Sequence, residues 1–211
     1  MRKTTLIALG LILLSLAAGL LLFPRLPDRI ASHWDMRGEA DGYSSKMFIF
    51  FLPALSAIIL GFFLLIPKID PLGKNIEGFR KYYDLIILSF IGFMSYLFFL
   101  TMLWNTGYIF NMSQMLAPAF GVLFYCLGIV VGNTKKNWFI GIRTPWTLSS
   151  DIVWYKTHKI GGKLFKAAGV VAFLGALLPA YALFFIIVPV IAVALYTVVY
   201  SYVEFVKQRR S

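Results

Sequence analysis

The chain has 211 residues, 60% of them hydrophobic, and a mean hydropathy of +0.80. Soluble domains use about 45–50% apolar residues, so this composition excludes a soluble globular domain and indicates an integral membrane protein. Lys and Arg (20) outnumber Asp and Glu (9), but membrane proteins collect Lys and Arg in cytoplasmic loops, so the net charge gives no reason to expect direct nucleic-acid binding.

Six apolar segments are long enough to cross a lipid bilayer, since a spanning helix needs about 20 residues. The first segment is longer than the core of a signal peptide and no small-residue cleavage site follows it, so we expect a retained anchor. The last two adjoin, and one helix over 164–202 would be about 58 Å long, so the chain should reverse near Pro179. The predicted spans are 4–23, 47–66, 85–104, 112–131, 164–178 and 181–202.

Positive charge is distributed unevenly between the two sides of these spans. Fifteen Lys and Arg lie in one set of alternate loops and four in the other, while Lys166 can reach the first side from within its span. Because cytoplasmic loops carry the excess of Lys and Arg, both termini should be cytoplasmic. The predicted fold class is all-α: a polytopic bundle of six transmembrane helices in the plasma membrane. We expect a first helical hairpin over 1–67, with an extracytoplasmic loop at 24–46, and a four-helix region over 68–211.

Small residues and a lack of charge characterise the predicted spans. Gly128 and Gly132 form a GxxxG pattern, and alanines recur every fourth residue from 168 to 180, as is typical of helix contacts in membranes. Apart from Asp84 and Lys166 near the interfaces, no ionisable side chain falls within a predicted span. Ion-coupled transporters and pumps generally need such groups, so the sequence does not favour these classes.

The extracytoplasmic segment 24–46 contains a cluster of aromatic, acidic and glycine residues. Its Asp-Gly pair predicts a turn, and its tryptophan can serve as an interfacial anchor or a binding aromatic. One histidine with scattered carboxylates lacks the spacing of a metal site, so no metal or other cofactor is predicted. A compact loop held by turns and a binding surface both stay open. The cluster comprises His33, Trp34, Asp35, Gly38, Asp41 and Gly42.

The cytoplasmic segment 133–163 contains the stretch GIRTPWTLSSDIVW, residues 141–154. Thr144-Pro145 is a turn signal, and Ser149 or Ser150 can cap the helix that follows. One interpretation is a capped amphipathic helix lying on the inner membrane surface, which does not account for the GIRTP part.

The same segment holds the residue types of a catalytic triad. Ser149, Ser150, Asp151 and His158 could supply a nucleophile, an orienting group and a base, and Asp151, Trp154 and His158 share one face at helical spacing. These residues sit on one short stretch without a nucleophile-elbow pattern. Catalysis is therefore not predicted.

Together, the two clusters resemble the SdpI immunity-protein family, membrane proteins that protect toxin-producing bacilli from their own secreted antimicrobial peptide. The outer segment is similar to the family's short extracytoplasmic motif, and residues 137–162 are similar to its cytoplasmic signature. The number of spans also agrees.

The resemblance implies immunity to a cannibalism-type peptide toxin and, as in the best-understood member, a receptor that sequesters a cytosolic transcriptional autorepressor at the membrane. It implies no catalytic residue and no cofactor. The outer cluster would meet the toxin, and the signature would bind the partner or support the structure. A passive small-molecule or peptide transporter or flippase is the alternative. The signature residues are Asn137, Gly141, Arg143, Thr144, Pro145, Trp146, Ser149, Asp151, Trp154 and His158.

Overall fold

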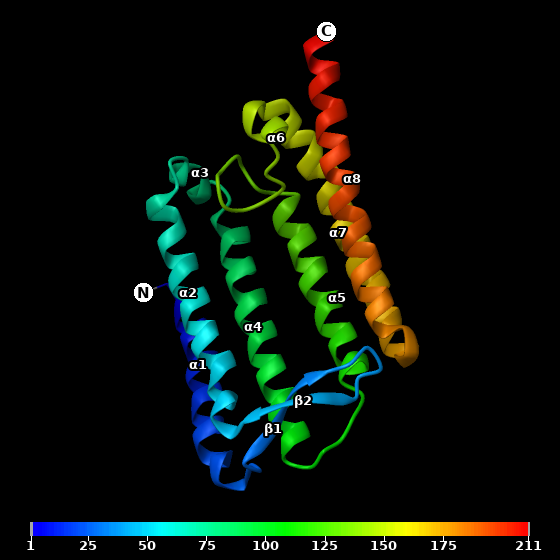
Figure 1. Cartoon of the computed structure of the whole chain (residues 1–211). Coiled ribbons are helices and arrows are strands. Elements are labelled where there is room, and N and C mark those ends of the chain that lie inside the picture. The colour runs from blue at the N-terminus through cyan, green and yellow to red at the C-terminus, as the bar shows by residue number, and fades with distance from the viewer. Residues whose placement is uncertain (1, 211) are drawn as a thin grey trace.

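Six long helices form the body of the protein in a computed structural model that describes residues 2–210 (Figure 1). All six are long and apolar enough to cross a membrane, which confirms the predicted spans. They are α1 (Lys3–Leu22), α2 (Phe51–Ile69), α4 (Arg80–Asn105), α5 (Met112–Val131), α7 (Asp151–Leu177) and α8 (Ala182–Arg210). Shorter helices connect them: η1 (Phe23–Arg25), η2 (Lys46–Phe50), α3 (Gly73–Glu77), α6 (Pro145–Ser149) and η3 (Pro179–Tyr181), the last forming the expected reversal.

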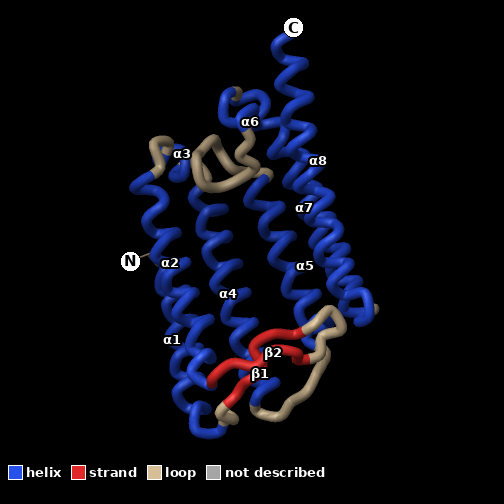
Figure 2. The backbone as a smooth tube through the Cα atoms, in the orientation of Figure 1, coloured by secondary structure: helices blue, strands red, loops and turns tan. Residues whose placement is uncertain are grey.

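The segment between η1 and η2 is a β-hairpin, where the sequence indicated a loop with turns. Its strands, β1 (Arg29–Trp34) and β2 (Ala40–Ser45), are antiparallel and are the two red strands of Figure 2. An isolated two-stranded hairpin is marginally stable in water, but this one is docked on the helices. Ile30 and Ala31 are buried, and Asn105 of α4 accepts from the Ala31 N–H at 2.7 Å and donates to its carbonyl at 3.0 Å.

Helix α7 also differs from the expectation of a surface helix followed by a separate span. It is one helix of 27 residues, which corresponds to about 40 Å. Ser150 caps it by accepting from the Val153 N–H at 3.3 Å. Gly132, just past the end of α5, lies against Gly162 of α7. Residues 151–161 therefore extend past α5, and the separate surface helix is wrong because the capped segment continues directly into the span.

The start of α1 and the last turns of α8 lie at one end of the bundle, which we call the loop end. The Arg2 guanidinium is 3.5 Å from the carboxylate of Glu77 at the end of α3, and Thr144, beside α6, shares a 3.0 Å hydrogen bond with Ser201 of α8. The β-hairpin and η3 lie at the opposite end, the hairpin end (Figure 1). Which side of the membrane each end faces stays a prediction.

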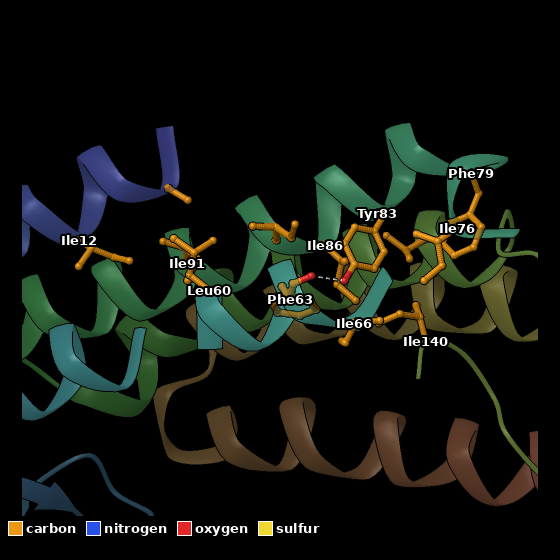
Figure 3. Packing of buried hydrophobic residues seen from close by; sticks show 13 residues of the cluster. Ile12, Leu60, Phe63, Ile66, Ile76, Phe79, Tyr83, Ile86, Ile91 and Ile140 are labelled. Carbon is orange, nitrogen blue, oxygen red and sulfur yellow. Dashed lines mark hydrogen bonds between the residues drawn. The ribbon is translucent and has the colours of Figure 1, made fainter. Parts of the chain in front are cut away.

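Buried residues from α1, α2, α3, α4 and the end of α5 form the largest apolar cluster, which joins the first helical hairpin to the rest of the bundle (Figure 3). Pro67 in α2 has no N–H, so the Phe63 carbonyl one turn earlier lacks its usual helical donor. The Tyr83 hydroxyl of α4 donates to that carbonyl at 2.5 Å, the dashed line in Figure 3. Ile140 reaches the same cluster from the loop end. The proposed boundary at 67/68 stays a prediction.

Glycines form the contact between α5 and α7. A Cβ added at Gly128 would lie 2.7 Å from the Gly162 carbonyl oxygen, and one at Gly121 would lie 2.9 Å from that of Gly169. The predicted Gly128 and Gly132 contact is thus present, because only glycine lets the two backbones approach this closely. The alanine ridge is shorter than predicted, since Ala180 is exposed in η3.

Candidate functional site

The turn of the β-hairpin is organised by Asp35. Its Oδ1 accepts from the backbone N–H groups of Arg37 at 2.8 Å and Glu39 at 3.0 Å. The Glu39 N–H has the largest influence on this carboxyl and, with the Arg37 side chain, lowers the pKa of Asp35 below its ordinary value of 3.8. The turn thus lies at residues 35–38. The turn predicted at Asp41-Gly42 is wrong, because both residues belong to β2.

Gly38 joins this turn to the start of α5. Its φ of +79° is a backbone conformation that favours glycine, and a Cβ there would collide with the Asn111 amide. Asn111 donates from Nδ2 to the Arg37 carbonyl at 2.5 Å, and the Met112 N–H donates to the Gly38 carbonyl at 3.2 Å. Asn111 also caps α5 by accepting from the Gln114 N–H. The hairpin turn is therefore attached to the first turn of α5.

His33 and Asp41 form an exposed pair on the hairpin. His33 Nδ1 lies 2.5 Å from Asp41 Oδ1, and both side chains are open to solvent. Gly42 faces His33 across the strands, where a Cβ would be 2.8 Å from the His33 Cβ. Within residues 2–210, no group of three or more His, Cys, Asp or Glu side chains is arranged to hold a metal ion.

Trp34 lies at the junction of the hairpin with the helices. Its ring meets Trp104 of α4 edge to face, with centroids 5.9 Å apart. The indole Nε1 is buried and has no hydrogen-bond partner among the described residues. Trp34 also lines a cavity of about 240 Å³, together with Ser32, Phe48, Ile49, Phe51, Leu52, Leu97 and Thr101. The hairpin end thus holds an aromatic side chain, with a buried and unpaired donor, beside a hollow lined mostly by apolar side chains.

At the loop end, the connection of residues 133–150 is ordered around Asn137, which is fully buried. Its Nδ2 donates to the carbonyls of Lys135 and Ile140, both at 2.9 Å. Its Oδ1 accepts from the N–H groups of Phe139 at 2.9 Å and Ile140 at 2.6 Å. A single amide therefore replaces the backbone partners that a helix or sheet would supply.

Two residues between α2 and α4 that the sequence analysis did not single out hold this connection in place. Asp70 Oδ2 accepts from the Trp138 N–H at 2.9 Å, and Asp70 Oδ1 accepts from the Leu72 N–H at 2.7 Å. Asn75 donates to the Lys136 carbonyl at 2.8 Å. The 133–150 loop is thus fixed to the α2–α3 connection as well as to α7.

His158 and Trp154 of α7 form the other support of the loop. The Ile142 N–H donates to His158 Nε2 at 2.9 Å, so Nδ1 carries the proton that bonds the Trp154 carbonyl at 2.8 Å. The two rings stack with centroids 3.9 Å apart, and Trp154 Nε1 donates to the Thr134 carbonyl at 3.1 Å. Gly141, with φ +118°, passes so close to the imidazole that a Cβ would overlap it. The sequence placed Trp154 and His158 on one face, and both are buried.

The short helix α6 connects the loop to α8. Thr144 Oγ1 accepts from the Thr147 N–H at 3.2 Å, and the Thr147 hydroxyl accepts from the Thr144 N–H at 2.9 Å, which makes a capping box. Pro145 takes the first helical position, where its missing N–H costs no helical bond. Trp146 packs on Tyr202 of α8, with ring centroids 5.1 Å apart.

The four residues considered for a catalytic triad are not brought together. Ser149 donates within α6, and Ser150 donates to Gln208 of α8 at 2.6 Å. Asp151 is exposed and pairs with a lysine of the loop. Both nitrogens of His158 are engaged by backbone groups. In this arrangement Ser149, Ser150, Asp151 and His158 support the loop and its helices.

One face of the loop is open to solvent. Arg143 is exposed and donates to the Trp138 carbonyl at 2.5 Å, and the Trp138 ring is half exposed. Pro145 and Ser149 are also exposed. Eight of the ten signature residues therefore separate into a buried set, Asn137, Thr144, Trp154 and His158, and an exposed set, Arg143, Pro145, Ser149 and Asp151, while Gly141 and Trp146 are partly buried.

Comparison with known proteins identifies related sequences over nearly the whole chain. Residues 133–201 match the model of the SdpI/YfhL protein family, and residues 10–57 match a domain of unknown function (DUF1648). The chain is 26% identical over 202 residues, 95% of both sequences, to immunity protein SdpI of Bacillus subtilis (strain 168). No solved structure matches. The resemblance to the SdpI family that we identified from the sequence motifs is confirmed.

Proposed function

We propose that this chain, which carries an SdpI/YfhL-type region, is a membrane immunity protein that protects its cell against a secreted antimicrobial peptide toxin of the cannibalism type. The observation that carries this proposal is the similarity to a protein named as an immunity protein over 95% of both chains. The similar region includes the hairpin and the 133–150 loop, the two clusters of polar residues in a chain that is otherwise mostly apolar.

The proposed orientation has the loop end in the cytoplasm and the hairpin end outside, in the plasma membrane. The distribution of Lys and Arg supports it, because the predicted loops at the loop end hold fifteen of these residues and those at the hairpin end hold four. A secreted peptide would then meet the hairpin first.

The hairpin should recognise the toxin by apolar and aromatic contact. The four acidic and four basic residues of 24–46 cancel in charge, and most are already paired: Lys46 with Asp28 at 3.0 Å, and Arg37 with Asp35 at 3.1 Å and Glu39 at 3.7 Å. Charge steering should therefore be weak. Met36 and Tyr43 are exposed on the hairpin, and Trp34 lines the adjacent cavity.

A signal to the cytoplasm would need a connected set of contacts between the two ends. Asn111 attaches the hairpin turn to α5, and the glycine contact attaches α5 to α7. His158 and Trp154 of α7 hold the 133–150 loop. A toxin-induced shift of the hairpin could thus change the exposed face around Arg143, and an autorepressor that binds one state better would be captured there.

Separation-of-function variants test the proposal in toxin-sensitive cells that express the chain at matched membrane levels. Trp34→Ala and Asp41→Ala should abolish survival in the presence of the toxin, whereas Asp28→Ala, at another exposed acid of the segment, should not. Arg143→Ala should release a fluorescent repressor from the membrane while protection persists, and Arg210→Ala is its control. Full protection by both hairpin variants would contradict the role of the hairpin, and unchanged repressor capture by Arg143→Ala would contradict the role of the loop.

A further inference from the structure

A cationic groove lies between α5 and α7 at the loop end, outside the residues to which we assign toxin or repressor contact. It has a volume of about 240 Å³ and is lined by three lysines of α7: Lys159, Lys163 and Lys166. Pockets for drug-sized ligands usually measure about 300–1,000 Å³. The groove therefore suits a small polar group.

The hollow exists because three glycines, Gly128, Gly132 and Gly162, form its floor. A Cβ on Gly128 would lie 2.6 Å from Cγ of Lys166, so the lysine stem runs directly across the bare backbone of α5. The three lysines are spaced i, i+4 and i+7, which puts them on one face of α7.

No acidic side chain balances these lysines. The groove is lined by no Asp or Glu, and among residues 2–210 none of the three ammonium groups lies within ion-pair distance of a carboxylate. Glu204 of α8 is occupied by Lys156 at 2.7 Å and Lys207 at 3.3 Å. The Lys159 ammonium group lies over the Tyr155 ring, 5.8 Å from its centroid.

The groove lies where the uncharged part of α7 ends, which is where we expect the headgroup layer. Gly128 and Gly132 belong to the last turn of α5 and its C-cap. Residues 167–177 of α7, which follow Lys166 toward the hairpin end, are all uncharged. Lysines at this border can place their ammonium groups among lipid phosphates while their stems stay in apolar surroundings.

We propose that this groove binds the phosphate of an anionic phospholipid headgroup, with Lys159, Lys163 and Lys166 as its ligands. Basic hollows between transmembrane helices bind anionic headgroups through this chemistry. A zwitterionic lipid carries its own cation and gains less from three unpaired lysines. This binding does not depend on the proposed immunity function.

The test is native mass spectrometry of the full chain in neutral detergent, titrated with phosphatidylglycerol and with phosphatidylcholine of the same acyl chains. Wild type should bind phosphatidylglycerol more tightly. A lysine near anionic lipid contributes about fivefold in affinity, so Lys159→Gln/Lys163→Gln/Lys166→Gln should weaken this binding by on the order of 100-fold. The Lys→Arg triple variant should retain it. Lys68→Gln/Lys74→Gln/Lys81→Gln loses the same charge from exposed sites at the same end and should bind like wild type.

Undiminished phosphatidylglycerol binding by the Gln triple variant would overturn the proposal. Equal affinity of wild type for the two lipids would do so as well. Displacement of the lipid by excess inorganic phosphate would identify a site for free anions and overturn the assignment to a headgroup. If the triple variant does not purify as a folded protein, the single exposed change Lys163→Gln carries the test, with an expected loss of about fivefold.

Discussion

Replacing Asn137 by Ala should open the 133–150 loop while the six helices stay in place. Asn137 makes two buried bonds with Ile140: its Oδ1 accepts from the Ile140 N–H at 2.6 Å, and its Nδ2 donates to the Ile140 carbonyl at 2.9 Å. A buried backbone group left without a partner costs about 1–3 kcal/mol. Loss of both should therefore lower the free energy of local opening by about 2–6 kcal/mol. The bonds to Lys135 and Phe139 are only partly buried, so water can replace much of their contribution.

Amide hydrogen exchange in detergent measures this opening at two reporters whose own acceptors are unchanged. The Trp138 N–H is bonded to Asp70 and the Ile142 N–H to His158. At tenfold per 1.4 kcal/mol, the smallest expected effect accelerates their exchange by about 30-fold. Asn133→Ala is the matched control, because this exposed amide donates to the Ile129 carbonyl of its own helix end and not to the 133–150 loop. Unchanged exchange of both reporters in Asn137→Ala would refute the view that Asn137 orders the loop.

Three further predictions follow from single contacts. Gly38→Ala should destabilise the hairpin by more than the about 1–2 kcal/mol that the left-handed backbone alone costs, because its Cβ would also collide with Asn111. The control Gly107→Ala, at φ +104° in open surroundings, should show the backbone cost alone. Equal losses of stability in thermal unfolding of the two variants would argue against the clash. Tyr83→Phe should lower the free energy of unfolding by about 1–3 kcal/mol, because it leaves the Phe63 carbonyl unpaired. Adding Pro67→Ala should recover part of this loss, because Ala supplies the missing N–H. No recovery in the double variant would contradict this account of Pro67. Since the folded pKa of Asp35 is lowered, its contribution to the stability of the turn is complete above pH 3.8 and is lost as pH falls through the lower folded pKa. The NMR resonance of the Glu39 amide should therefore stay constant from pH 7 to about 4 and move only below that pH. A transition near neutral pH would be inconsistent with this assignment.

The spans could be predicted because a bilayer imposes a length and an apolar composition that the sequence displays directly. The start of α7 could not be predicted, since a Ser cap is compatible with a surface helix and with the start of a span. Which of the two forms depends on Gly162 packing against Gly132, a contact between two different helices.

The hairpin and the loop show the same division between local and long-range information. Asp41-Gly42 is a good local turn signal, but the turn forms at Asp35–Gly38, where Gly38 can dock on Asn111. Asp70, Asn75 and Asn105 were missed because their roles depend on backbone groups distant in sequence, such as the Trp138 N–H and Ala31. Asn111 had a local signal as an Asn directly before a predicted helix.

Survival of toxin-sensitive cells that express this chain tests the central claim most directly. The dose response to a secreted cannibalism-type peptide toxin is measured for cells with the chain and for cells with an empty vector, with membrane levels of the chain verified. We expect the chain to shift the lethal toxin concentration upward and Trp34→Ala to return it to the vector value. Equal killing of both cell types, with the wild-type chain folded in the membrane, would contradict the proposed immunity function.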